Sequence, residues 1–393
     1  MKSSFAKKFM VVALAMVMVF TFAACGGSSD GGSGDAEAGP VLKIGSTGPL
    51  TGGASVYGTA VKQGAQIAVD EINAQETEFQ IEFNMQDDEA DGEKSVNAYN
   101  NLKDWGVQII MGSVTTGSCI TVAAETYNDR VFELTPSASS ADVTAGKDNV
   151  FQVCFTDPNQ GIKAADYITE NFAGKKVGVI YNNSDPYSTG IFNAFKAEMD
   201  AKGGEIVSTE GYPDDTNADF EGLLNKSKEA GAEVILLPIY YTPASLILDK
   251  ANSINYKPVF FGVDGMDGIL DMEGFDTALA EGVMLMTPFN PWSTDENVAS
   301  FVEKYQAAYN NELPNQFAAD GYDAIYAIYN AFKAAGLSTD QSNEEICDAM
   351  IAQFTGGFSY DGLTGTAMTW NDKGEVNKTP VVCVIEGGIY VDK

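Results

Sequence analysis

The chain has 393 residues, of which 45% are hydrophobic and 11% aromatic, so it is long enough and apolar enough to bury the cores of about two domains. Its 55 acidic residues against 23 basic ones give a net charge of −32, which disfavours nucleic acid and anionic lipid as partners. The chain contains no histidine. Catalysis by Ser–His–Asp or Cys–His groups and histidine zinc sites are therefore excluded.

The first 24 residues have the pattern of a signal peptide. Three lysines precede the unbroken apolar run "FMVVALAMVMVF" (9–20), which is too short to cross a bilayer and predicts export of the chain. The next letters, "FAAC", resemble the lipobox of bacterial lipoproteins with Phe22 in place of the commoner Leu, and imply a lipid on Cys25. The alternative is an ordinary cleavage site. Residues 25–40, rich in Gly, Ser and Asp, predict a flexible tether to the outer face of a membrane.

Strand and helix patterns alternate over the next two hundred residues. The first run predicts strands at 41–46, 80–86, 107–112 and 131–135 and helices at 57–74, 93–105 and 118–128. The rhythm restarts after "FQVCFTDPNQG", with helices at 161–171, 188–202, 219–230 and 243–254 and strands at 176–182, 205–209, 233–239 and 258–263. This alternation favours parallel sheets with helices on both faces, and its restart predicts two doubly wound, Rossmann-like lobes.

The last hundred residues predict elements that complete both lobes. They comprise a strand in "GVMLMTPFNPW", helices at 295–310, 317–335 and 343–354, a Gly-rich stretch, and strands in "AMTWNDKG" and "VVCVIEGGIYV". We expect the chain to cross back to the first lobe near 286–291 and to the second near 356–362. The first lobe then comprises 41–156 plus 288–355 and the second 157–287 plus 356–393, joined by a three-segment hinge.

Loops that follow the strands of the first run are small, hydroxylated and uncharged. In open α/β sheets ligands bind outside the carboxyl ends of the strands. Here "GSVTTGS" and "TPSASS" lead into helices, whose N-terminal N–H groups can hold an anion without Arg or Lys. Thr116, Ser118, Ser137 and Ser139 are therefore candidates to bind a carboxylate. The alternative is that these hydroxyls cap their own helices.

The corresponding loops of the second run carry aromatic rings and carboxylates. They contain Tyr187, Tyr240, Tyr241, Asp185, Asp264 and Asp267. Aromatic faces and a carboxylate suit a cation, although Asp264 before Gly265 is also typical of a turn. One lobe thus suits an anion and the other a cation, the two ends of an amino-acid zwitterion.

Seven segments in order resemble one family. They are "LKIGSTGPLTG", "GAQIAVDEIN", "DDEAD", "LTPSASS", "DPNQG", "VGVIYNNSDPYSTG" and "MTWNDKG". The chain resembles the type I periplasmic binding proteins of the leucine/isoleucine/valine-binding group, the substrate-binding components of ABC importers. The resemblance implies a monomeric, lipid-anchored receptor without enzymatic activity, cofactor or metal. It would close its lobes on an amino acid with a branched-chain or other apolar or aromatic side chain and deliver it to the permease and ATPase subunits.

The same resemblance implies a set of ligand-binding residues. They are Tyr57, Thr115, Thr116, Ser137, Ala138, Ser139, Tyr187, Tyr241 and Asp264. Asp264 falls where the family has Glu, which keeps the charge but shortens the reach. The loop 51–56 is longer than in better-known members, which leaves the side-chain specificity open.

Other functions remain open at this point. The same fold could bind an amide, an aromatic acid or a nucleoside, or act as a sensor. A carboxylate-pair hydrolase would use Asp185 and Asp264. The sequence contains no P-loop, and no G-x-G-x-x-G opens a helix after a strand. We expect Cys119, Cys154, Cys347 and Cys383 to be small buried residues, with one bridge possible.

Overall fold

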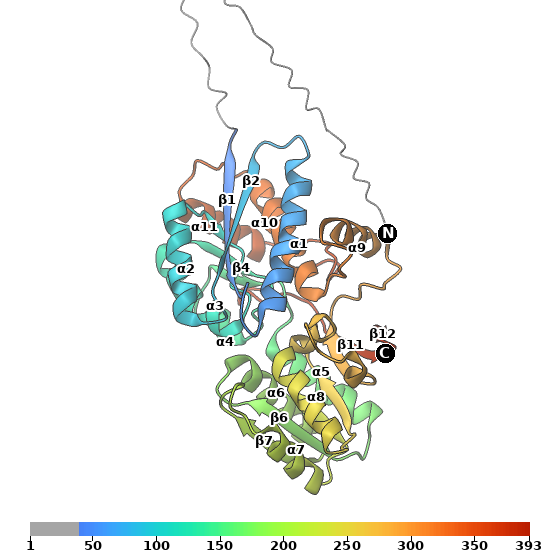
Figure 1. Ribbon diagram of the computed structural model, residues 1–393. Coiled ribbons are helices and arrows are strands. Elements are labelled where there is room, and N and C mark those ends of the chain that lie inside the picture. The colour runs from blue at the N-terminus through green and yellow to red at the C-terminus, as the bar shows by residue number, and fades with distance from the viewer. Residues whose placement is uncertain (1–38) are drawn as a thin grey trace, which may run out of the picture. The chain divides into compact units, whose positions relative to one another are not determined.

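In the computed structural model, which describes residues 39–393, the chain forms two sheets with helices on both faces (Figure 1). The predicted signal peptide and Cys25 lie outside the described residues. The first sheet has the strand order β2-β1-β3-β4-β5, and all its strands are parallel. Its strands are β1 (Val41–Gly48), β2 (Gln80–Asp87), β3 (Ile109–Ile110), β4 (Phe132–Thr135) and β5 (Val150–Gln152).

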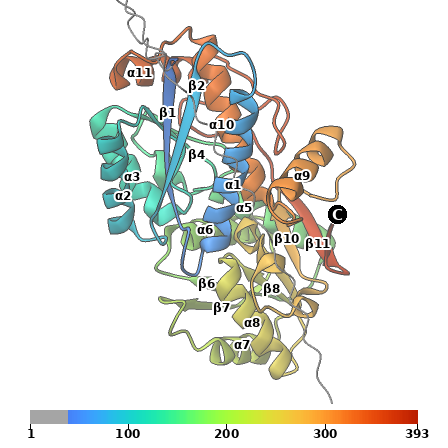
Figure 2. The same cartoon turned by 45° about the horizontal axis from the view of Figure 1, so that its top comes forward.

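Helices from both ends of the chain cover the first sheet. They are α1 (Ser55–Asn73), α2 (Gly92–Trp105), α3 (Thr116–Asp129), α4 (Ala141–Thr144), α9 (Glu296–Ala308), α10 (Gln316–Ala334) and α11 (Asn343–Thr355). Helices α1 and α10 lie side by side in both views (Figures 1 and 2). They approach closely because Gly64 has no side chain: a Cβ there would lie 1.8 Å from the Ala318 carbonyl oxygen. We call this sheet with its helices the first lobe.

The second sheet has the order β12-β11-β10-β9-β8-β6-β7. Its strands are β6 (Val177–Asn182), β7 (Ile206–Tyr212), β8 (Val234–Leu237), β9 (Val259–Gly262), β10 (Met284–Thr287), β11 (Val381–Glu386) and β12 (Ile389–Asp392). Strands β6 to β10 are parallel, whereas β11 runs antiparallel to both β10 and β12. Gly387 and Gly388, with φ of 62° and 80°, make the tight turn between the last two strands.

Four helices and three short 3-10 turns complete the second lobe. They are α5 (Asp157–Asn171), α6 (Pro186–Lys202), α7 (Phe220–Glu229), α8 (Tyr241–Ser253), η1 (Asp264–Met266), η2 (Ile269–Asp271) and η3 (Thr277–Ala280). Apolar residues of α5 and α6 pack on one face of the sheet, and those of α7 and α8 pack on the other. The predicted α/β class and the two doubly wound lobes are thus confirmed.

The chain passes between the lobes three times, and the third passage is later than predicted. The first follows β5 and the second follows β10. Before the third, Trp370 Nε1 donates to the carbonyl of Gln152 (2.7 Å) and the Gln152 N–H donates to Gly374 (2.9 Å). Residues 360–378 therefore pack with the first lobe, and the crossing predicted near 356–362 is wrong, because the Trp370 ring joins the aromatic core around Phe354 at 4.6 Å.

Most predicted elements appear within a few residues of their expected bounds. The strand expected in "AMTWNDKG" is wrong: that segment makes only isolated bridges, Tyr360 with Met368 and Trp370 with Val376. The short helix α4 was not predicted. All four cysteines of residues 39–393 are buried and free, and within the same range no helix is long and apolar enough to cross a membrane.

Candidate functional site

A small cavity lies where the carboxyl ends of the two sheets meet. Its volume is about 20 Å³, roughly the space of one water molecule. Both lobes line it, through Tyr57, Val114, Thr115, Thr116, Ser137, Tyr187, Tyr240, Asp264, Gly265 and Phe317. A ligand of amino-acid size can enter only if the two walls move apart, which the three connecting segments permit.

The first-lobe wall is the N-terminus of α3. Thr115 precedes the helix but makes no side-chain capping bond, and its buried hydroxyl has no partner among the described residues. The first helical bond runs from the Cys119 N–H to the Thr115 carbonyl (2.9 Å), so the preceding N–H groups have no partner within the helix. The Thr115 hydroxyl therefore does not cap α3, although Thr115 occupies the N-cap position. This end of α3 can accept an anion.

The loop after β4 contributes only Ser137 to the cavity. The Ser137 hydroxyl donates to the Val114 carbonyl (2.6 Å), which fixes this loop against the start of α3. Ala138 instead packs in an apolar cluster behind the cavity, with Cys119 and Val143. The Ser139 hydroxyl is buried and unpaired among residues 39–393, and it does not line the cavity. Of the three residues expected from this loop, Ser137 lines the cavity, whereas Ala138 and Ser139 do not.

Asp264 is the carboxylate of the second-lobe wall. It is 4% exposed, and the Tyr187 hydroxyl donates to its Oδ1 at 2.6 Å. Its backbone is held on both sides, because its N–H donates to Gln160 Oε1 (3.0 Å) and its carbonyl accepts from Gln316 Nε2 (2.8 Å). Burial raises the pKa of Asp264 to about 6, and the Tyr187 hydrogen bond offsets part of the rise. A cation entering the cavity would stabilise the ionised form and lower this pKa again.

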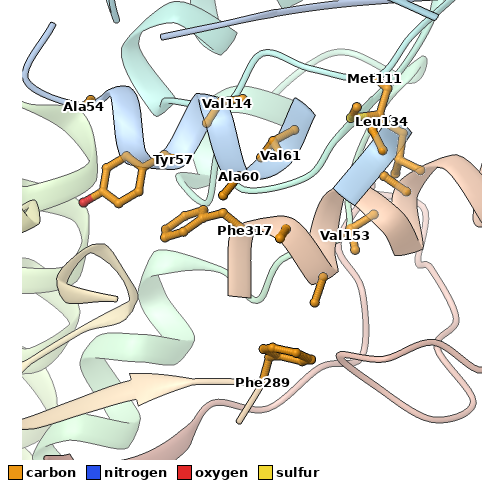
Figure 3. Packing of buried hydrophobic residues seen from close by; sticks show 14 of the residues in the cluster. Ala54, Tyr57, Ala60, Val61, Met111, Val114, Leu134, Val153, Phe289 and Phe317 are labelled. Carbon is orange, nitrogen blue, oxygen red and sulfur yellow. The ribbon is translucent and has the colours of Figure 1, made fainter. Parts of the chain in front are cut away.

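Aromatic rings from both lobes fill the space beside Asp264. Tyr240 stacks on Tyr187 with ring centroids 4.9 Å apart and an angle of 15°, and it meets Tyr57 edge-on at 5.6 Å. Phe317, at the start of α10, lies 4.3 Å from Tyr57, and Figure 3 shows these two rings together. The predicted ligand contact Tyr241 does not line the cavity, whereas its neighbour Tyr240 does.

Tyr57 connects the two lobes directly. Its hydroxyl donates to the Gly265 carbonyl and accepts from the Tyr241 N–H at 3.1 Å. Tyr241 returns the contact, because its hydroxyl accepts from the Val56 N–H at 3.2 Å. The Thr242 hydroxyl adds a bond to the Gly53 carbonyl (2.7 Å). The longer loop 51–56 therefore serves, with Tyr57, as the contact between lobes, and these bonds must break when the cavity opens.

Comparison with known proteins assigns the chain to a family. The family model described as "Periplasmic binding protein" matches residues 41–388, nearly all of the described chain. The chain belongs to the periplasmic binding protein family. Members of this family are substrate-binding proteins of transporters and are not enzymes, so the resemblance drawn from the seven segments is confirmed at the level of the family.

Individual relatives agree with this assignment. The chain is 31% identical to the Leu/Ile/Val-binding protein homolog 3 of Brucella melitensis, over 77% of this chain and 81% of that protein. The crystal structure of the substrate-binding protein LivJ from Streptococcus pneumoniae in complex with isoleucine matches with a TM-score of 0.78, 28% identity, and coverage of 90% and 100%. A solute-binding protein of Rhodopseudomonas palustris BisB5, in complex with 3,4-dihydroxybenzoic acid, shares the fold at a TM-score of 0.79 and 20% identity, with coverage of 90% and 96%.

Several lining residues of this periplasmic binding protein were not expected from its sequence. Phe317 lies far along the chain from the other loops, at the start of a helix whose pattern indicates only core packing. Val114 and Gly265 are neighbours of expected residues and carry no polar signal. Tyr240 belongs to the aromatic loop after β8, but the sequence does not decide which of two adjacent tyrosines at the start of α8 faces the cavity.

The other carboxylates of the second-run loops have structural partners. Asp185 caps α6, where it accepts from the Tyr187 N–H (3.2 Å). Asp267 accepts from the hydroxyls of Tyr390 (2.7 Å) and Thr287 (3.2 Å). Neither lines the cavity, so the pair that a hydrolase would need is not assembled there.

Proposed function

We propose that this protein binds an α-amino acid between its lobes and delivers it to an ABC importer. The observation that carries the proposal is the chemical opposition of the cavity walls: unpaired hydroxyl and N–H donors of α3 face the carboxylate of Asp264 across one cavity. No Lys or Arg is among the residues that line this cavity. Such a site fits a molecule that carries both charges close together.

The carboxylate of the ligand would bind at the first lobe. Thr115 supplies a hydroxyl with no protein partner, and the helix N-terminus supplies backbone donors. The Ser137 N–H already donates to the Thr135 hydroxyl, at 3.3 Å. Ser137 would therefore contribute through its carbonyl, toward the ammonium.

The ammonium would bind at the second lobe. Asp264 provides the charge, and the stacked rings of Tyr187 and Tyr240 provide aromatic surface next to it. Tyr57 and Phe317 would contact the side chain of the ligand, which favours an apolar or aromatic one. The Leu/Ile/Val-binding names of the relatives agree with this preference.

A thermal-shift screen of residues 39–393 tests the proposal. The probes are the twenty amino acids, with simple amides, aromatic acids and nucleosides for comparison. A ligand that binds only the folded state raises the melting temperature as its concentration exceeds the dissociation constant. We expect shifts with branched-chain or aromatic amino acids. A shift with an aromatic acid or nucleoside, and with no amino acid, would overturn the zwitterion site.

The proposal includes a lipid anchor at Cys25, which would keep the receptor beside its permease. Labelled palmitate should enter the wild-type protein when it is expressed in a bacterial host, and the Cys25→Ser variant should remain unlabelled. Equal labelling of both proteins, or of neither, would remove the anchor from the proposal. Ligand binding by residues 39–393 would be unaffected by that result.

A further inference from the structure

The carboxyl group of Asp157 is fully enclosed and unpaired. Its side chain is 0% exposed, and neither Oδ1 nor Oδ2 has a hydrogen-bond partner among residues 39–393. Buried polar groups are nearly always hydrogen-bonded, because leaving one unpaired costs stability. Because the unpaired carboxyl group of Asp157 costs stability, we looked for a role of this residue in function.

Asp157 stands at the first passage between the lobes. It is the first residue of α5, and its N–H donates to the Ser139 carbonyl in the first lobe (2.9 Å). On its other side lies α6, where a Cβ on Gly190 would be 3.2 Å from Asp157 Oδ2. Gly190 lies one helical turn after Tyr187, and the Tyr187 hydroxyl donates to Asp264. The carboxyl group thus lies between the serine loop of one lobe and the Asp264 wall of the other.

Ser139 is the polar side chain next to this carboxyl group. Its hydroxyl is also 0% exposed and unpaired within the described residues. Burial raises the pKa of Asp157 well above its usual range, the nearby Ser139 hydroxyl offsets part of this rise, and the charge of Asp264 adds to it. A serine hydroxyl has one proton to donate and lone pairs to accept with, so the group that takes its proton decides where the lone pairs point.

We propose that Asp157 is a positioning residue for the ligand's ammonium group. Ser139 lies behind the present cavity, so it reaches the ligand only in the wider cavity of the complex. There the Asp157 carboxylate accepts the Ser139 proton, and the Ser139 oxygen presents its lone pairs to the ammonium as a second acceptor beside Asp264. An ammonium group has three donors, so both acceptors can be used at once. The inference rests on the proposed amino-acid site and specifies it: the site selects a primary amine and not merely a carboxylic acid.

A purely structural role for Asp157 makes a different prediction. An acidic residue in the first turn of α5 would stabilise the helix through its dipole, and Asp157→Asn would then lower the melting temperature of the ligand-free protein. Under the positioning role, Asp157→Asn replaces a buried ionisable group by a neutral one without changing the shape of the side chain. The melting temperature of the ligand-free variant should then stay unchanged or rise.

Calorimetric titration with the best amino acid from the screen, leucine for example, provides the test. We expect Asp157→Asn to weaken binding about tenfold or more, the usual loss for a hydrogen bond to a charged group. Ser139→Ala should weaken binding at least as much, and the double variant no more than Ser139→Ala alone, because Asp157 acts through Ser139. Asp142→Asn, an exposed carboxylate in the same region, is the matched control and should bind like wild type.

Three results would overturn the inference. They are unchanged affinity in Asp157→Asn, independent losses that multiply in the double variant, and a lowered melting temperature of ligand-free Asp157→Asn. The first two require that the wild type binds the amino acid, whereas the third is measured without ligand. Failure of the wild type to bind any amino acid would instead overturn the proposed function, and the inference with it.

Discussion

Replacing Asp264 by Asn should make the ligand-free protein more stable and the receptor nearly inactive. Asn keeps the size of the side chain and can still accept the Tyr187 hydroxyl at the position of Oδ1, which lies 2.6 Å away. The variant loses only the negative charge. Burial disfavours this charge, because Asp264 is 4% exposed.

The size of the stability gain follows from the pKa of Asp264. Burial raises this pKa from 3.8 to about 6, so between these values the folded protein binds more protons than the unfolded chain. Stability therefore falls as the pH rises through this window, and above pH 6 the cost reaches about 3 kcal/mol. Asn has no proton to lose. At pH 7.5 the variant should be more stable by up to about 3 kcal/mol, and the difference should disappear as the pH falls to 4.

The loss of binding should be at least as large. Removing one partner of a buried charge pair costs about 2–5 kcal/mol, or roughly 30-fold to several-thousand-fold in affinity. The wild type should also lose about tenfold in affinity between pH 7 and pH 5, because a protonated Asp264 no longer attracts the ammonium. Asp264→Asn should show no such pH dependence.

Denaturant titration at pH 7.5 and pH 4, with calorimetry at pH 7 and pH 5, measures both effects. Asp142→Asn, with an exposed carboxylate, is the control for a general change in charge. If Asp264→Asn were less stable than wild type at pH 7.5, the burial argument would be refuted. If it still bound the amino acid with wild-type affinity, Asp264 would not hold the ammonium.

Three further predictions concern other residues. Tyr240→Ala should remove the ring stacked on Tyr187 and weaken the binding of every amino acid, because aromatic surface beside the ammonium is lost; unchanged affinities in calorimetry would contradict this role. Lys378→Met should destabilise the fold by about 3–5 kcal/mol in denaturant titration, because it leaves Asp320, its 3.0 Å partner with both side chains 2% exposed, as an uncompensated buried charge. Adding Asp320→Asn should restore much of the loss, and no recovery would refute the pairing. Burial raises the pKa of Glu133 to about 7, so Glu133→Gln should be more stable than wild type above pH 7 and equal to it near pH 4; a parallel pH profile of both proteins would argue against an ionised Glu133.

The sequence by itself determined the fold class, the order of the elements and the chemical character of the two walls. Alternating periodicities give parallel α/β layers wherever the chain can bury both faces of a strand. Ligand-binding loops must follow the carboxyl ends of such strands. Thr116, Ser137, Tyr187 and Asp264 were found in this way, and all four line the cavity.

Only the tertiary structure decided which side chains reach the cavity and which support it. Tyr240 lies at the N-cap of α8 and lines the cavity, whereas Tyr241, the first residue of the helix, bridges the lobes. Phe317 enters from a helix that is distant in the chain. The third crossing was misplaced because the buried ring of Trp370 binds its segment to the first lobe. The local sequence pattern sets where an element begins and ends. Burial depends instead on contacts with residues that are distant in the sequence. The unpaired carboxyl group of Asp157 could therefore be recognised only in the folded chain.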